Sequence, residues 1–115
     1  MTLATQTALS SYCVMWLFVM FDLPTDTKKQ RKAATQFRKA LMKDGFVMHQ
    51  FSVYIRHCAS NEASTVHINR VKTLVPEEGL ISIVKITDAQ YGQTINLVGR
   101  KSQPPPAQYM QMEFF

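Results

Sequence analysis

Hydrophobic side chains gather first in an almost unbroken run over residues 12–23, which is rich in aromatic and β-branched residues and holds no Gly or Pro. A run of this kind is typical of a strand that is buried on both faces. Such a strand needs cover on both sides. Alternate side chains would point to opposite faces, with Tyr12, Val14, Trp16, Phe18 and Met20 on one and Cys13, Met15, Leu17, Val19 and Phe21 on the other.

After Pro24 the hydrophobic period lengthens to between three and four residues, which predicts a helix that begins at Thr27. Thr27 and Gln30 have the spacing of a capping box, in which each side chain binds the backbone N–H of the other. Gly45, directly after Asp44, is a natural residue to end the helix. The buried stripe would consist of Ala33, Ala34, Phe37, Ala40 and Leu41.

Four more elements are predicted after this helix. Strict alternation over residues 46–57 predicts one strand, with Val47, Phe51, Val53 and Ile55 on one face. A second helix is expected from Ser60 or Asn61 to about Val75, because Pro76 would stop it. Residues 79–87 and 94–99 have the composition of strands, and residues 88–93, which contain Gly92, would form the turn between them.

We assign residues 12–99 to one α+β domain with the ferredoxin-like βαββαβ arrangement. Residues 1–11 would be a loose leader before this domain. Three consecutive prolines favour an extended linker over residues 100–108. Residues 109–115 alternate again and predict an extra C-terminal strand, which would pair with another subunit's sheet edge through Tyr109, Met110, Met112 and Phe114.

The number of layers predicts a homodimer. Two helices cover one face of a four-stranded sheet, yet the strand over residues 12–23 is apolar on both faces. A monomer would then expose a large hydrophobic surface, which proteins in water seldom tolerate. We therefore expect two copies to pack their open sheet faces together around a two-fold axis.

Basic residues are concentrated in one element. The 115 residues carry 13 Lys and Arg against 8 acidic residues, a net charge of +5 that favours a polyanionic partner. Seven of these bases fall within the first predicted helix with no acid between them: Lys28, Lys29, Arg31, Lys32, Arg38, Lys39 and Lys43. A helix face that only faces solvent usually mixes Glu with Lys, so we expect this face to contact the phosphates of a nucleic acid. Arg56 would extend that surface, or would simply end its strand.

Several other classes of protein are not indicated. The apolar run over residues 12–21 is half the length of a membrane span. Cys13 and Cys58 lack the spacing of a zinc site and lie in strand-like runs, so reduced thiols in a cytoplasmic protein are expected. No nucleophilic triad and no phosphate-binding glycine loop can be recognised. His49 and His67 lie among apolar positions and are expected to be packed side chains.

An ordered set of motifs resembles one known family. The set consists of FDLP, TKKQRKAATQFRKAL, KDGF, QFSVYIRHC, VKTLVP and ISIVKITDAQYG, which lie within residues 12–99. In this order they are similar to the Cas-two family, the second core protein of CRISPR adaptation, and most similar to members from type II systems. The resemblance implies a ferredoxin-like homodimer that bridges dimers of the spacer integrase. It would hold double-stranded DNA by its backbone, without reading sequence, while the integrase transfers strands.

The same resemblance implies an alternative, a magnesium-dependent endonuclease that cleaves single-stranded RNA or double-stranded DNA. Its metal ligand and catalytic residue would be Asp22, although an Asp before Leu-Pro is also a common way to end a strand. One carboxylate is a poor Mg²⁺ site, but two Asp22 side chains near a dimer axis would supply a pair. Phe21 stands where many relatives have Tyr, which favours the scaffold over the enzyme. A ribonuclease of toxin type that acts without an integrase is a third possibility.

Overall fold

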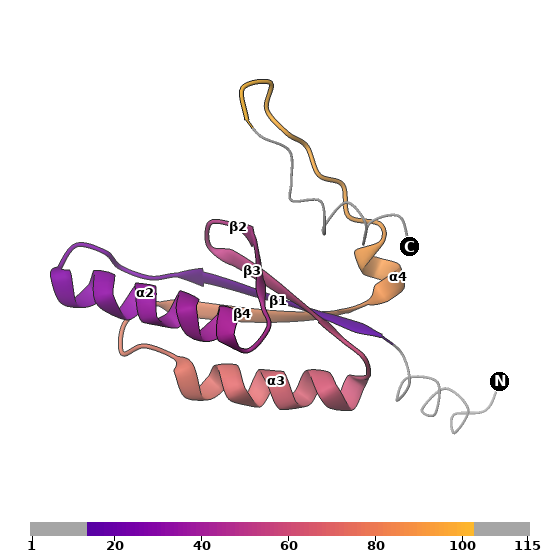
Figure 1. Cartoon of the computed structure of the whole chain (residues 1–115), viewed down its shortest axis with the longest axis horizontal. Helices are drawn as coiled ribbons and strands as arrows, with labels where there is room; N and C mark the ends of the chain where they lie inside the picture. Colours follow the sequence, from indigo (N-terminus) through magenta and orange to yellow (C-terminus); the bar gives the residue numbers. More distant parts are fainter. Residues whose placement is uncertain (1–13, 103–115) are drawn as a thin grey trace.

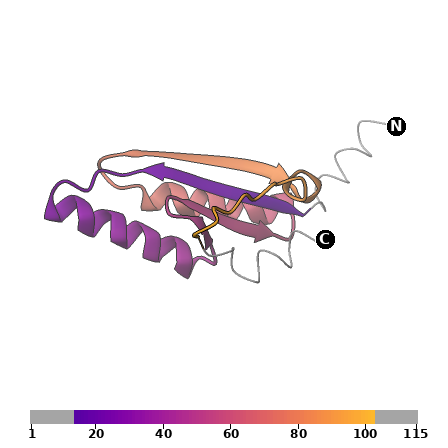
Figure 2. The same cartoon turned by 90° about the horizontal axis from the view of Figure 1, so that it is seen from above.

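A four-stranded antiparallel sheet carries two long helices on one of its faces (Figures 1 and 2). This computed structural model describes residues 14–102. The strands run in the order β2-β3-β1-β4, which is the ferredoxin-like topology and confirms the predicted fold class. The elements along the chain are β1 (Met15–Asp22), α2 (Lys28–Lys43), β2 (Val47–Gln50), β3 (Val53–Cys58), α3 (Asn61–Leu74), β4 (Leu80–Thr87) and α4 (Asp88–Tyr91).

The apolar strand β1 lies in the middle of the sheet, between β3 and β4. Its side chains Leu17, Val19 and Phe21 are buried against the helices, where they meet Phe37 of α2 and Val71 of α3. Because β1 has a neighbouring strand on each side and helices above it, this central strand is largely shielded from water. This shielding explains its nearly continuous hydrophobic sequence. Ala34, Phe37 and Leu41 of the stripe predicted for α2 are buried, as expected.

The ends of α2 follow the sequence signals closely. Thr27 and Gln30 form the predicted capping box, in which the Gln30 N–H donates to Thr27 Oγ1 over 3.1 Å. Asp44 caps the C-terminal end, and Gly45 has a φ of +91°, in the left-handed region that favours glycine. Ser60 likewise caps α3, and the last helical residue is Leu74.

The single strand predicted over residues 46–57 is wrong, because the chain folds into a hairpin of β2 and β3 with a turn at Phe51 and Ser52. In this hairpin Val47 pairs with Ile55 and Met48 with Tyr54, but the register shifts before Gln50, which pairs with Val53. Partners in an antiparallel ladder point to the same side of the sheet. Gln50 therefore lies on the same side as Val53, and the alternation expected over residues 46–57 is interrupted by this irregularity before the turn.

Residues 94–99 are also not a strand in this structure. The second and third strands of the βαββαβ order are therefore the two strands of the hairpin, β2 and β3, and this segment supplies none of the four. Residues 88–91, predicted as a turn, form the short helix α4, which begins with a capping box between Thr87 and Gln90. Within residues 94–99, Ile95 and Leu97 are 81% and 92% exposed.

The face of the sheet opposite the long helices is partly covered by α4. Tyr91 stacks on Trp16 with ring centroids 3.9 Å apart, and Trp16 Nε1 donates a hydrogen bond of 2.7 Å to Asp88. Toward the other end of this face, Met20 and Val84 remain partly exposed. The face is thus half closed by the chain itself, and only the remainder is open to a partner.

Some predictions lie outside the described residues: the leader over residues 1–11, most of the proline-rich linker, and the C-terminal strand with Tyr109, Met110, Met112 and Phe114. Among residues 14–102, no helix has the length and apolar character needed to cross a membrane.

Candidate functional site

The outer side of α2 presents a row of cationic side chains to solvent. We call this set the basic face, and its members are Lys28, Arg31, Lys32, Lys39 and Lys43, all of them exposed. The face exists because Ala34, Phe37 and Leu41 are buried on the inner side of the same helix. The predicted amphipathic pattern therefore places these bases as expected.

The lysines of the basic face have no acidic partner in the described part of the chain. No ion pair or hydrogen bond among residues 14–102 involves the ammonium groups of Lys28, Lys32, Lys39 or Lys43. The Arg31 guanidinium is held at the start of α2, where Nη1 donates to the carbonyl oxygens of Thr25 and Asp26. Because α2 itself contains no acid, its positive charges repel one another unless anions are bound.

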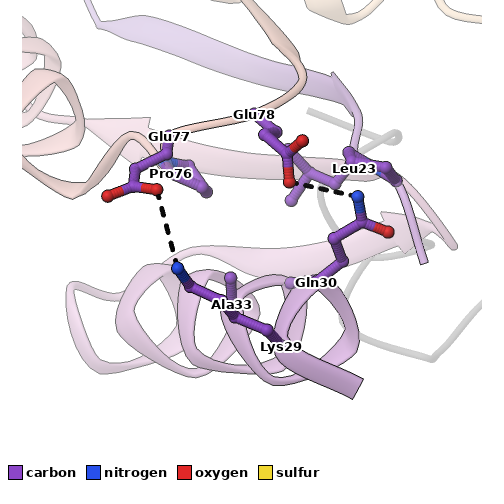
Figure 3. Close-up of a pocket in the computed structure, with 9 residues that line it drawn as sticks. Leu23, Lys29, Gln30, Ala33, Pro76, Glu77 and Glu78 are labelled. Carbon is purple, nitrogen blue, oxygen red and sulfur yellow. Dashed lines mark hydrogen bonds and ion pairs between the residues drawn. The ribbon is translucent and has the colours of Figure 1, made fainter. Parts of the chain in front are cut away.

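Lys29 is also exposed, but it differs from the lysines of the basic face in having an acidic residue nearby. Its Nζ lies 3.9 Å from a carboxylate oxygen of Glu77, and Gln30 donates to Glu78 over 3.1 Å (Figure 3). These contacts cross a small hollow of about 100 Å³ between α2 and the loop before β4. Leu23 also lines this hollow. The two glutamates form an acidic border to the basic face on this side.

The helical pattern predicts that Arg38 points outward with the lysines, but in the structure it does not. The side chain is half-buried, and its guanidinium carbon lies 4.5 Å from the ring centroid of Phe51 and 5.4 Å from that of Phe21. Both distances are within the range of a cation–π interaction. Arg38 thus lies between the end of β1 and the turn of the β2–β3 hairpin.

Arg56 also has a structural role that the sequence did not indicate. Its Nε donates a 2.8 Å hydrogen bond to the carbonyl oxygen of Asp44, and its Nη1 donates to the carbonyl oxygen of His57. The C-terminal carbonyls of a helix lack partners within the helix, so this guanidinium stabilises the end of α2. The expectation that Arg56 extends the basic face gains no support from this position.

The side chain of Asp44 connects α2 to α3. One carboxylate oxygen lies 2.8 Å from Nδ1 of His67, and the other accepts a 2.7 Å hydrogen bond from Nη1 of Arg70. Burial by itself would raise the pKa of Asp44, but the hydrogen bonds and charges of His67 and Arg70 lower it below its ordinary value. The packed state expected for His67 is confirmed, and its partner is a carboxylate.

Asp22 is exposed at the end of β1, in register with Leu80 of β4. It borders a shallow surface hollow of about 300 Å³, whose other polar side chains are Ser52 and Ser82. Gly79 lies close by with a φ of +110°, and a Cβ there would come within 2.8 Å of the carbonyl oxygen of Asp22. Only glycine allows the start of β4 to lie against the end of β1 in this way.

The carboxylate and the basic face lie on different sides of the sheet. Asp22 alternates with Phe21, which is buried under the helices, and therefore shares the opposite face with Met20. Among residues 14–102, no group of three or more His, Cys, Asp or Glu side chains is placed to hold a metal ion. One subunit therefore offers Mg²⁺ a single carboxylate, fewer ligands than this ion requires from a protein site of its own.

Cys58 is a buried free thiol at the end of β3, and burial raises its pKa. A protonated, inaccessible thiol is a packed side chain and not a nucleophile. This agrees with the reduced thiol expected at that position.

Three residues of these sites were missed by sequence reasoning: Asp44, Arg70 and Phe51. Asp44 and Arg70 are 26 positions apart, and no local pattern relates them. Phe51 was assigned to the inner face of a strand, but in the turn it is 74% exposed. The dipeptide Phe-Ser carries none of the Gly, Asn or Pro signals that usually reveal a hairpin turn.

The fold and the basic face together define a small ferredoxin-like α+β protein with a surface complementary to polyanions. Comparison with known proteins identifies the family: residues 15–94 match the family model described as CRISPR associated protein Cas2. The chain belongs to the Cas2 family. This is the family suggested by the ordered motifs.

Individual relatives are similar in sequence over nearly the whole chain. A protein of Flavobacterium psychrophilum is 46% identical over 109 residues, which cover 95% of each chain, and one of Parvibaculum lavamentivorans is 50% identical over 88% of this chain and 100% of its own. Both are named CRISPR-associated endoribonuclease Cas2. A solved structure titled "Crystal structure of cas2" superposes with a TM-score of 0.56 at 21% identity, over 79% of this chain and 93% of that one. The last comparison supports the fold alone.

Proposed function

We propose that this protein is the DNA-holding subunit of a CRISPR spacer-acquisition complex. A homodimer would bind double-stranded DNA through its phosphates, without reading base sequence, while integrase dimers carry out the strand transfer. The observation that supports this proposal best is the basic face: an acid-free helix whose outward lysines have no acidic partner within residues 14–102. Family membership supports the CRISPR setting.

Phosphate binding is the favoured use of these charges for an energetic reason. Each lysine that meets a phosphate releases condensed counterions from the DNA, which favours binding and makes it strongly salt-dependent. Contacts between point charges and phosphates hold the DNA backbone, and they do not distinguish one base sequence from another. Lysine side chains make up most of the basic face, and contacts from lysine to phosphate suit a subunit that holds DNA of any sequence.

The remaining open part of the sheet supports the homodimer. Met20, Leu80 and Val84 leave hydrophobic area exposed on the face without long helices. Ile95 and Leu97 add exposed apolar side chains in an extended segment. A second copy of the chain would bury these surfaces, and the predicted C-terminal strand would then pair with its sheet edge.

Charge reversal on the basic face tests the proposal. In the full-length protein, Lys28→Glu, Lys32→Glu and Lys39→Glu together should abolish binding to a blunt DNA duplex in fluorescence anisotropy. A matched triple variant, Lys72→Glu, Arg100→Glu and Lys101→Glu, changes the net charge equally at exposed positions outside α2 and should keep most of the affinity. Equal loss in both variants would show that only net charge matters and would overturn this role of α2.

A second function, metal-dependent endonuclease, is favoured by the position of Asp22 and by the printed names of the relatives. Two Asp22 side chains from a dimer would hold one Mg²⁺, which when bound would supply an activated water for attack on a phosphodiester. Ser52 and Ser82 beside Asp22 are neutral hydroxyls that would orient water or phosphate oxygens. Within one subunit the set is incomplete, so this function requires the dimer.

One variant, Asp22→Ala, distinguishes the two proposed functions. Asp22→Ala should leave duplex binding and the dimer unchanged, since Asp22 lies on the other side of the sheet from the basic face. If the protein is a nuclease, a highly purified Asp22→Ala preparation has no Mg²⁺- or Mn²⁺-dependent cleavage of RNA or DNA, whereas the unaltered protein does. Cleavage that survives the substitution would assign the activity to a contaminant. Normal spacer acquisition by the variant would show that any cleavage is dispensable.

A further inference from the structure

Phe51 has an unusual position for a large aromatic residue. It lies at the tip of the β2–β3 hairpin, and 74% of its surface is exposed. The guanidinium of Arg38 stacks over one side of its ring at 4.5 Å from the centroid. A cation on one face of the ring leaves the other face open to solvent. The ring is thus held in place from behind and presents a flat apolar surface outward.

Arg38 carries a charge that the described part of the protein does not neutralise. None of the ion pairs among residues 14–102 includes Arg38, and its buried Nε has no hydrogen-bond partner there. A half-buried guanidinium without a counter-ion is costly, and a bound anion would offset that cost. Arg38 and Phe51 therefore place an unneutralised cation directly beside a free aromatic face.

This pair matches the chemistry of one nucleotide, and we infer that Phe51 and Arg38 form a stacking site for an unpaired nucleotide. The base would stack on the open face of Phe51, and a phosphate of the same strand would approach the Arg38 guanidinium. Inside a duplex each base is covered by its neighbours and held by its pair, whereas a base in a single-stranded overhang or strand is free to stack on an aromatic ring. This inference rests on the proposed nucleic-acid binding and adds a preference for unpaired ends.

The position of the stacking site relates it to Asp22. Ser52, the residue after Phe51, lines the same hollow as Asp22, and its carbonyl oxygen accepts a hydrogen bond from the N–H of Phe21. A strand whose unpaired base lies on Phe51 would thus be held next to the end of β1. Phe51 acts here as a positioning residue, since it would orient a strand and take no part in a reaction.

The test compares four probes on the full-length protein: a blunt DNA duplex, the same duplex with a short single-stranded overhang, a single-stranded DNA and a single-stranded RNA. 2-Aminopurine in the unpaired segment reports stacking by its quenching. The unaltered protein should bind the overhang duplex about ten-fold more tightly than the blunt duplex and quench the probe. Phe51→Leu should lose this preference and the quenching while it binds the blunt duplex normally, and Phe51→Tyr should retain both.

Met48→Ala is the matched control, because Met48 is a half-exposed apolar residue of the same hairpin and should change neither quantity. Thermal unfolding shows whether each variant keeps its fold. The inference is overturned if the unaltered protein shows no preference for unpaired bases, if Phe51→Leu retains the preference, or if Phe51→Leu weakens blunt and overhang duplexes equally. The two single strands reveal whether DNA or RNA is preferred, and they test stacking even if the blunt duplex does not bind. If the protein failed only to bind the blunt duplex, the proposed function would be contradicted. The stacking site would then be judged from the single-stranded probes.

Discussion

The two ends of the helix α2 use positive charge in opposite ways. Along most of its length the lysines of the basic face point to solvent without an acidic partner among residues 14–102. At its C-terminal end, Arg56 and Arg70 converge on Asp44, one on its carbonyl oxygen and the other on its carboxylate. The first group leaves charge available for a ligand, whereas Arg70 is paired with a carboxylate and Arg56 donates to backbone carbonyl oxygens.

The difference shows that a count of basic residues does not locate a binding surface. Arg56 and Lys39 look equivalent in the sequence, but only Lys39 has an unengaged side chain in the structure. What separates the two residues is the proximity of an acceptor that is fixed by the tertiary fold. Substitutions at the two ends should therefore have different consequences, one for affinity and the other for stability.

The largest expected effect is on the salt dependence of duplex binding. Lys28→Ala, Lys32→Ala and Lys39→Ala should each reduce the slope of log affinity against log salt by about 1, because each removes one phosphate contact. The free energy of unfolding should stay the same, since these side chains contact no other part of the described structure. Titrations at several salt concentrations measure the slope, and a slope unchanged in all three variants would contradict the role of the basic face.

At the other end of α2, Asp44→Ala should destabilise the protein by roughly 2–3 kcal/mol, because it leaves the buried His67 side chain and the Arg70 guanidinium without their acceptor. Chemical denaturation measures this loss. Duplex affinity at a temperature where the variant is folded should not change. If Asp44→Ala lost duplex affinity and kept its stability, this end of α2 would serve binding, and the stated difference between the two ends would be wrong.

Acid should weaken the fold through the same carboxylate. The pKa of Asp44 is lowered in the folded state, so its contribution to stability is constant above its ordinary value of 3.8. Below this pH the unfolded chain takes up the proton first, and the contribution is lost progressively as pH falls through the folded pKa. Asp44→Asn should lack this component. Unfolding experiments from neutral pH to acid would compare the two proteins, and identical pH dependence would contradict the assignment.

The smallest effect is expected at the acidic border of the basic face. Glu77→Gln should raise duplex affinity about two-fold, because one repulsive charge near the phosphates is removed. The Lys29–Glu77 contact is long and its side chains are 89% exposed, so stability should hardly change. Glu62→Gln, at an exposed position near the start of α3, is a control of equal charge. An equal gain in both variants would indicate a general charge effect.

Local signals predicted the parts of the molecule that depend on neighbours in sequence. The capping residues Thr27, Gln30 and Ser60, the left-handed Gly45 and the buried position of β1 under the helices all follow from short patterns. The hairpin turn at Phe51 did not, because neither Phe51 nor Ser52 is Gly, Asn or Pro, and no local pattern marks the register shift before Gln50. The strand expected over residues 94–99 did not form, because its alternation does not by itself provide a partner strand.

The sequence by itself determined the fold class and the basic face, since both arise from periodicity along one element and the burial that it imposes. Only the tertiary structure decided which bases keep their charge free. It placed Arg56 and Arg70 on Asp44, and it placed Arg38 on the ring of Phe51. These contacts join residues from separate elements, and the physical reason is that a charge is neutralised by the groups that lie near it in space.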